Sequence, residues 1–156
     1  YEKNVINDVV LNKNIKFNNK ILHQSKLLNY FIKELNNEKI SKDTNEILKK
    51  IKSNKKYIFS RKDKILLDSL RYDGINIKKK FDNLYEKDPN IPTDLQVLIN
   101  NNNIGMILLR LVEIIGEDQI ENLGTETLYF ITAVLNETNL DNLRNKIIIK
   151  TLPNRV

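Results

Sequence analysis

The sequence lacks cysteine altogether and has one histidine, His23, among its 156 residues. Disulfides, zinc–thiolate sites, iron–sulfur clusters and thiol catalysis are therefore excluded, and no multi-histidine metal site can form. Four glycines and three prolines are too few for a strand-rich sandwich with a turn about every ten residues. The longest apolar stretch, 104–115, is interrupted by Arg110 and Glu113 and is shorter than the about 20 residues that cross a bilayer. We expect a soluble chain with neither metal nor cofactor.

What is present is enough for one folded domain. Apolar residues make up 40% of the chain and charged residues 29%, which argues against intrinsic disorder. A chain of this length buries roughly 70% of the surface that it exposes when unfolded. We therefore expect a single domain over 1–156. The first residue is Tyr1 rather than Met, so we expect a processed or trimmed chain.

Apolar residues recur at helical spacing along the whole sequence, which predicts an all-α fold. Four helical regions are expected: about 2–36, 43–86, 94–115 and 125–151, with a break at Asn18 as the alternative for the first. Short loops between them favour an antiparallel four-helix bundle. Residues 104–115 have so wide an apolar face that we expect them to be the most buried segment.

Polar residues mark where these helices begin and end. Ser60 and Asp63 resemble a capping box, and Gly74 and Gly116 are expected to end helices. Asn100–Asn103 are candidates to interrupt the third region. The other expected caps are alternatives at each position: Ser41 or Asp43, Thr93 or Asp94, and Asn139 or Asp141.

Charge is unevenly divided. Residues 1–87 hold 21 basic and 11 acidic side chains, whereas 88–156 hold 5 and 9. Basic residues that could contact an anionic partner, either nucleic acid or a phospholipid surface, are Lys49, Lys50, Lys52, Lys55, Lys56, Arg61, Lys62, Lys64, Lys78, Lys79 and Lys80. Tyr57 and Phe59 lie inside this cluster and either stack on the partner or anchor the core. A solvated surface enriched in lysine by codon usage is favoured over specific recognition, because arginine is scarce.

Other chemistry is weakly indicated. His23 and Ser25 are two residues apart and would point to different helix faces. Glu34 with Glu38, and Glu117 with Glu121, have the spacing of paired carboxylates but no histidine partner. No catalytic residue is identified, so we expect a protein that is not an enzyme and has no small-molecule substrate. Ser25 and Asn102 fall on apolar helix faces and, if buried, would lower the stability of the fold.

The composition itself points to an origin. The chain has 24 Asn, 22 Ile and 21 Lys against 5 Arg and 1 Ala, the bias that A- and T-rich codons produce. Asn100–Asn103 and the run Ile147-Ile148-Ile149-Lys150 typify it. In this bias, in length and in helix layout the chain resembles the family of malaria-parasite sporozoite microneme proteins essential for cell traversal.

That resemblance implies a secreted, microneme-located four-helix bundle, required for crossing host cells, that contacts a membrane or a protein partner. No signature motif carries functional residues over to this chain. A parasite helical domain exported into the host red cell is disfavoured, because the sequence has no tryptophan. The alternative function is an intracellular nucleic-acid-binding or scaffold subunit that uses the region Lys49–Lys64.

Overall fold

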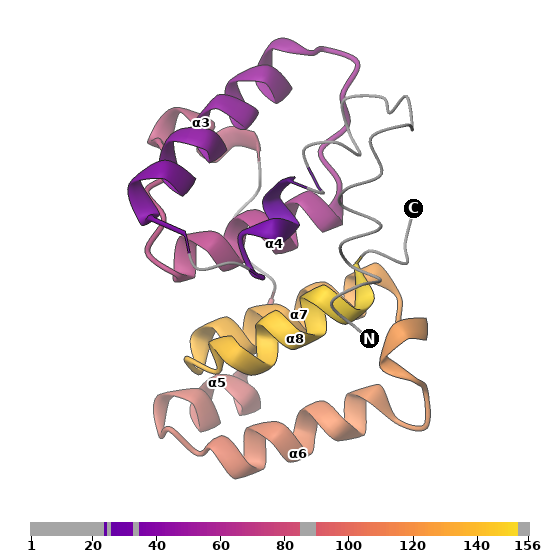
Figure 1. Cartoon of the computed structure of the whole chain (residues 1–156). Helices are drawn as coiled ribbons and strands as arrows, with labels where there is room; N and C mark the ends of the chain where they lie inside the picture. The colour runs from indigo at the N-terminus through magenta and orange to yellow at the C-terminus, as the bar shows by residue number, and fades with distance from the viewer. Residues whose placement is uncertain (1–23, 25, 33–34, 85–89, 153–156) are drawn as a thin grey trace.

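The computed structural model describes residue 24 and residues 26–32, 35–84 and 90–152. These residues form helices and no strand, so the predicted all-α class is confirmed. The α-helices are α3 (Asn37–Ser53), α4 (Arg61–Tyr72), α5 (Thr93–Asn100), α6 (Ile104–Ile115), α7 (Thr125–Glu137) and α8 (Asp141–Thr151), and η1 (Lys79–Leu84) and η2 (Ile120–Asn122) are short 3₁₀ helices (Figure 1).

The core lies where α4, α7 and α8 meet. Helix α7 packs against α4 on one side and against α8 on another. Leu67, Ile131 and Ile148 are at most 1% exposed there, and each such side chain stabilises the fold by about 1.5–3 kcal/mol on burial. Helix α3 contacts η1, and α5 and α6 pack together as a hairpin.

An antiparallel four-helix bundle is not confirmed, because the predicted long regions are divided into shorter helices. The region 43–86 holds the end of α3, an irregular segment at 54–60, all of α4, and η1. Of the region 2–36, residues 2–23 lie outside the described residues, and the helical turns at 26–29 end in a turn at 30–32.

The sequence predicts a helix start near residue 43, but α3 begins earlier, at Asn37. Asn36, expected to end a helix, begins α3 instead: its Oδ1 accepts a hydrogen bond from the Glu38 amide at 2.8 Å. Ser41 and Asp43, the expected caps, lie inside α3 and bind other partners. The Ser41 hydroxyl accepts from the Asn76 amide, and the Asp43 carboxylate accepts from the Tyr30 hydroxyl.

Two other expected caps are also wrong. Helices α5 and α8 have Pro92 and Leu140 at their N-caps, and neither makes a side-chain cap. The two aspartates expected there are engaged by arginines: Asp94 by Arg110 at 2.6 Å and Asp141 by Arg144 at 3.3 Å.

Several boundaries are confirmed. Ser60 and Asp63 form both hydrogen bonds of a capping box at the start of α4. Gly74 and Gly116 follow α4 and α6 with φ of 85° and 63°, a conformation that favours glycine. Asn101–Asn103 separate α5 from α6, and Asn102 is exposed in the turn with φ 53°. Asn102 therefore carries no burial cost.

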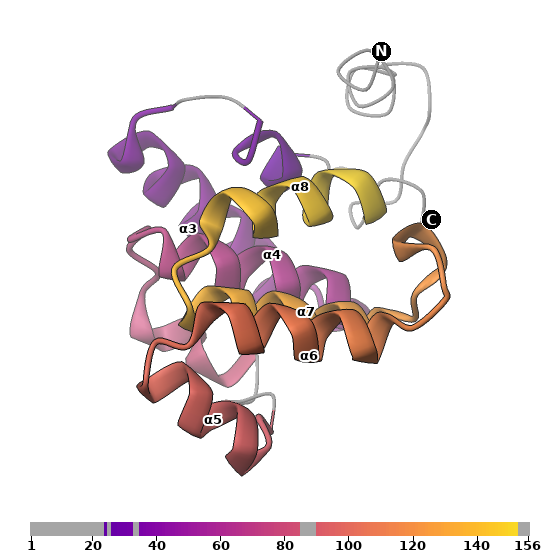
Figure 2. The same ribbon diagram turned by 90° about the horizontal axis from the view of Figure 1, so that it is seen from below.

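Helix α6 is not the most buried segment. Of its twelve residues only Ile107 and Leu111 are buried, whereas Leu109 is 52% exposed and Val112 is 61% exposed. The helix lies on the outside of the fold, at the lower edge of Figure 1 and nearest the viewer in Figure 2. An apolar face this wide exceeds what one packed side can cover.

The most connected side chain is Arg144 of α8, which is fully buried. Its Nη2 donates to both carboxylate oxygens of Asp73, at 2.7 and 2.8 Å, and its Nη1 donates to Asn136 at 2.9 Å. Asp141 and Asn145 accept further hydrogen bonds, and the guanidinium carbon lies 5.8 Å from the centre of the Phe31 ring. Arg144 thereby joins the end of α4 to α7 and α8.

Arg144→Met should cost about 3 kcal/mol of unfolding free energy, because it strands Asp73 and the buried Asn136 amide without their partner. The matched control is Arg71→Met, which removes the Arg71–Asp82 pair, at 2.9 Å and with both side chains 38% exposed. That pair should contribute less than about 1 kcal/mol. Urea denaturation at neutral pH measures both, and equal losses would contradict a special role for Arg144.

Candidate anion-binding cleft

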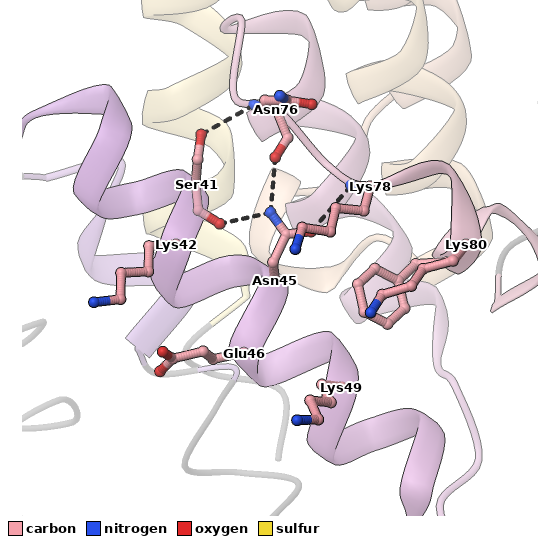
Figure 3. Close-up of a pocket in the computed structure, with 9 residues that line it drawn as sticks. Ser41, Lys42, Asn45, Glu46, Lys49, Asn76, Lys78 and Lys80 are labelled. Carbon is pink, nitrogen blue, oxygen red and sulfur yellow. Dashed lines mark hydrogen bonds between the residues drawn. The ribbon is translucent and has the colours of Figure 1, made fainter.

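A cleft of about 480 Å³ opens between α3 and the segment 76–81, which follows α4. One of its nine lining residues is Phe81, and the other eight are of polar or charged type: Ser41, Lys42, Asn45, Glu46, Lys49, Asn76, Lys78 and Lys80 (Figure 3). The two walls are about thirty residues apart in the sequence. The fold, and not local sequence, therefore brings these side chains together.

Asn45 joins the two walls of the cleft by hydrogen bonds. Its Nδ2 donates to the Ser41 carbonyl at 2.7 Å and to the Asn76 carbonyl at 2.8 Å, and its Oδ1 accepts from the Lys78 amide at 3.0 Å. The Ser41 hydroxyl accepts from the Asn76 amide at 3.1 Å. These bonds satisfy the backbone of an extended stretch that has no strand partner, and they fix the position of Lys78 relative to α3.

Four lysines and one glutamate are among the residues that line the cleft. Lys42 and Lys49 are seven residues apart and share one face of α3, with Glu46 between them, while Lys78 and Lys80 come from the opposite wall. The Lys52 ammonium donates to the Lys80 carbonyl at 3.0 Å, and the Lys80 Nζ lies 5.0 Å from the centre of the Phe81 ring. A concave site with excess positive charge suits phosphate, sulfate or carboxylate groups.

The eleven predicted basic residues do not form one surface. Lys49, Lys78 and Lys80 line the cleft, and Lys52 borders it through Lys80. Another set is exposed but does not line the cleft: Lys50, Lys55, Lys56 and Lys79.

The last three predicted residues serve the packing of α4. Arg61 binds Glu126 of α7 at 2.6 Å, and the Lys62 ammonium donates to the Leu152 carbonyl at 3.4 Å. Lys64 is buried, and its Nζ lies 5.1 Å from the Tyr129 ring centre, as does the Arg61 guanidinium. Arg61 and Lys64 contact α7, and Lys62 contacts Leu152 at the end of α8, so the three residues take part in packing and do not line the cleft.

Tyr57 and Phe59 pack against the core, as the core-anchor interpretation predicts. The Tyr57 hydroxyl donates to the buried Asp63 carboxylate, which also accepts from the Ser60 amide at 3.0 Å and from Gln24 at 3.0 Å. Between the two aromatic residues, Ile58 is 80% exposed. Side chains alternate in direction along this short segment, so the Ile58 side chain points to solvent while those of Tyr57 and Phe59 pack against the core.

Two contributors to the cleft were missed from the sequence. Lys42 is one helical repeat of seven residues before Lys49, a spacing that places both on one face and could have identified it. Nothing in the sequence distinguishes Asn45 from the other asparagines, because it is one of 24 and its role depends on the distant residue Asn76.

Three of the four paired carboxylates, Glu38, Glu117 and Glu121, lie within the described residues. Glu121 binds Lys150 at 2.9 Å, and this hydrogen bond holds the pKa of the Glu121 carboxyl below its ordinary value. Glu117 and Glu38 are exposed. His23, Ser25 and Glu34 lie outside the described residues.

Searches for metal sites and membrane spans cover the described part of the chain only. Within it, no three His, Cys, Asp or Glu side chains are grouped so that they could hold a metal ion. Across the same residues, every helix is too short or too polar to cross a membrane.

Comparison of the chain with protein-family models, with curated proteins and with solved structures finds no match. The cleft must therefore be interpreted from its own geometry and charge.

Tyr57 should make stability depend on alkaline pH. Burial, the hydrogen bond to Asp63 and that carboxylate's charge raise the pKa of the Tyr57 phenol far above its ordinary value of 10.0. The neutral phenol therefore stabilises the fold fully below about pH 10, the unfolded pKa, and this contribution is lost as pH rises toward the folded pKa.

Tyr57→Phe should lose about 1 kcal/mol at pH 8 with the hydrogen bond, and its stability should fall less steeply than that of the unaltered chain above about pH 10. Urea denaturation from about pH 8 to pH 11 measures both effects. Tyr72→Phe, which removes an exposed contact to Glu137, serves as the control. Parallel pH profiles for Tyr57→Phe and the unaltered chain would contradict this account.

Proposed function

We propose that the protein is a non-enzymatic binding protein that engages an anionic partner through the cleft between α3 and 76–81. The observation that carries this proposal is that four lysines from two walls, Lys42 and Lys49 with Lys78 and Lys80, line one concave site. Gathering four like charges is electrostatically unfavourable, and an anionic ligand relieves that repulsion. The single carboxylate of Glu46 only partly offsets it.

The partner that we favour is an anionic membrane surface. Lysine binds phosphate as a flexible point charge, whereas the bidentate recognition of bases relies on arginine. The cleft is lined by lysine and no arginine. Each lysine held near an anionic leaflet contributes about 1 kcal/mol of binding free energy, so four could recruit the chain reversibly.

The alternative, an intracellular nucleic-acid-binding or scaffold subunit using Lys49–Lys64, is disfavoured by three contacts. Arg61, Lys62 and Lys64 are engaged with α7, Leu152 and the Tyr129 ring. Fewer basic side chains of the region Lys49–Lys64 are therefore available to a partner than the sequence alone suggests.

The biological setting follows the resemblance drawn from composition and helix layout. We propose a secreted protein of a malaria-type parasite, a four-helix bundle by that likeness, whose membrane or protein contact serves host-cell traversal. The non-enzymatic part of the proposal rests on the sequence, which has one histidine and no cysteine.

The double substitution Lys49→Gln with Lys78→Gln should weaken binding to vesicles of phosphatidylcholine containing phosphatidylserine about 30-fold. This follows from about 1 kcal/mol for each of two lysines. Flotation at low salt measures the effect, and raising the salt concentration should weaken binding by the unaltered chain. The control is Lys146→Gln, which removes an exposed charge on α8 and should change binding little.

Parallel titrations with single-stranded RNA separate the two partner classes. RNA binding that needs Lys49 and Lys78 while vesicle binding is absent would favour the nucleic-acid alternative. Equal vesicle binding by the double variant and by Lys146→Gln would show that the cleft does not bind the anion.

A further inference from the structure

Helix α6 exposes more apolar surface than any other described helix. Met106, Leu109, Val112 and Ile114 are between 41% and 61% exposed, and Val97 of the adjoining α5 is 50% exposed. Five of the nine large apolar side chains exposed in the described residues thus lie on one helical hairpin. Apolar surface concentrated in this way marks a contact site for another molecule, whereas single exposed apolar residues do not.

The exposed face of α6 has a symmetric pattern. Gly105, Leu109 and Val112 follow one another at spacings of four and three residues, so they share one side of the helix, and Gly116 comes four residues later as the C-cap. Read from either end, the order is small, large, large, small. A twofold interface requires that residue i contacts residue j while j contacts i, and this stripe meets that requirement when two copies run antiparallel.

Gly105 gives a second, independent indication. Gly105 is the second residue of α6, and a Cβ added there would meet no atom within 4 Å. Packing within the chain therefore does not require glycine at this position. A glycine on an exposed helix face allows the backbone of a second helix to approach closely. Gly116, by contrast, is accounted for by its φ of 63° at the end of α6.

The charges beside the stripe are self-complementary. Arg110 and Glu113 lie three residues apart on the same side of the stripe, both exposed, with Arg110 bound to Glu113 at 3.2 Å and to Asp94 at 2.6 Å. In an antiparallel pair, a twofold axis near 110–111 brings Arg110 of each copy beside Glu113 of the other. An anionic membrane fits this face poorly, because Asp94, Glu113 and Glu117 border it.

We propose that α6 is the interface of a symmetric homodimer, in which it pairs antiparallel with α6 of a second copy. Leu109 of one copy contacts Val112 of the other, and Gly105 lies across from Gly116. Twelve helical residues span roughly 18 Å, which places the contact at the small end of specific interfaces. We therefore expect a reversible dimer with a dissociation constant in the micromolar range. This inference is independent of the cleft between α3 and 76–81.

Sedimentation velocity of the full chain, over roughly 1–200 µM, tests the proposal. We expect a concentration-dependent change from monomer to dimer. Leu109→Glu should weaken self-association roughly tenfold or more, because two carboxylates would be buried at the centre of the interface. The control Leu143→Glu alters a comparably exposed leucine on α8 and should leave the dimer intact.

The geometry has its own test, made simple by the absence of cysteine. Chains carrying Leu109→Cys and chains carrying Val112→Cys are mixed and oxidised, and mass spectrometry distinguishes the products. Random pairing of equal amounts would make about half of the dimers mixed, so antiparallel pairing predicts a mixed disulfide dimer well above that share. A parallel pair would instead favour the two symmetric products and would overturn the proposed arrangement.

Three other outcomes would overturn the dimer itself. The first is a monomer at every concentration. The second is a dimer that Leu143→Glu disrupts and Leu109→Glu does not, which places the interface elsewhere. The third is a monomer whose binding to anionic vesicles depends on Leu109, which would make this face a membrane contact.

Discussion

The buried guanidinium of Arg144 is the contact on which the arrangement of the helices depends. Its side chain carries a charge and has no solvent exposure, and it is stabilised because Asp73, Asn136, Asp141 and Asn145 together accept its hydrogen bonds. Apolar packing of α4, α7 and α8 tolerates small shifts, whereas a bidentate ion pair fixes the angle and the register. This contact therefore specifies which helix ends meet, and α3 and the segment 76–81 are positioned by their connection to α4.

The sequence predicts the helices better than it predicts their arrangement. Helical periodicity and local signals identified the Ser60–Asp63 capping box and the glycines after α4 and α6, because these depend on neighbouring residues. The start of the region 43–86 was wrong because Asn36 begins α3, whereas the predicted interruption by asparagine is confirmed at Asn101–Asn103, between α5 and α6. Arg144 was not identified at all, since its partner Asp73 is 71 residues away and nothing local marks an arginine as buried.

The candidate site was predictable only in part, for the same reason. A count of basic residues located the charge but could not distinguish Lys49, which lines the cleft, from Lys64, which is buried against Tyr129. That distinction depends on which face of α4 packs against α7. Helix α6 shows the converse error, because a wide apolar face was taken to mean burial when half of it is exposed. An apolar face wider than one neighbour can cover indicates either a central helix or an interface, and periodicity alone does not separate the two.

The contact between Arg144 and Asn136 also limits how the chain can be modified. Asn136, Glu137 and Thr138 form the acceptor sequence for N-linked glycosylation. The Asn136 side chain is 3% exposed and accepts a hydrogen bond from Arg144 at 2.9 Å, so the folded protein cannot receive a sugar there. A glycan attached before folding would occupy the space of the guanidinium and would prevent α8 from docking on α7. In a secretory pathway, rapid closure of this contact would therefore protect the chain from a modification incompatible with its fold.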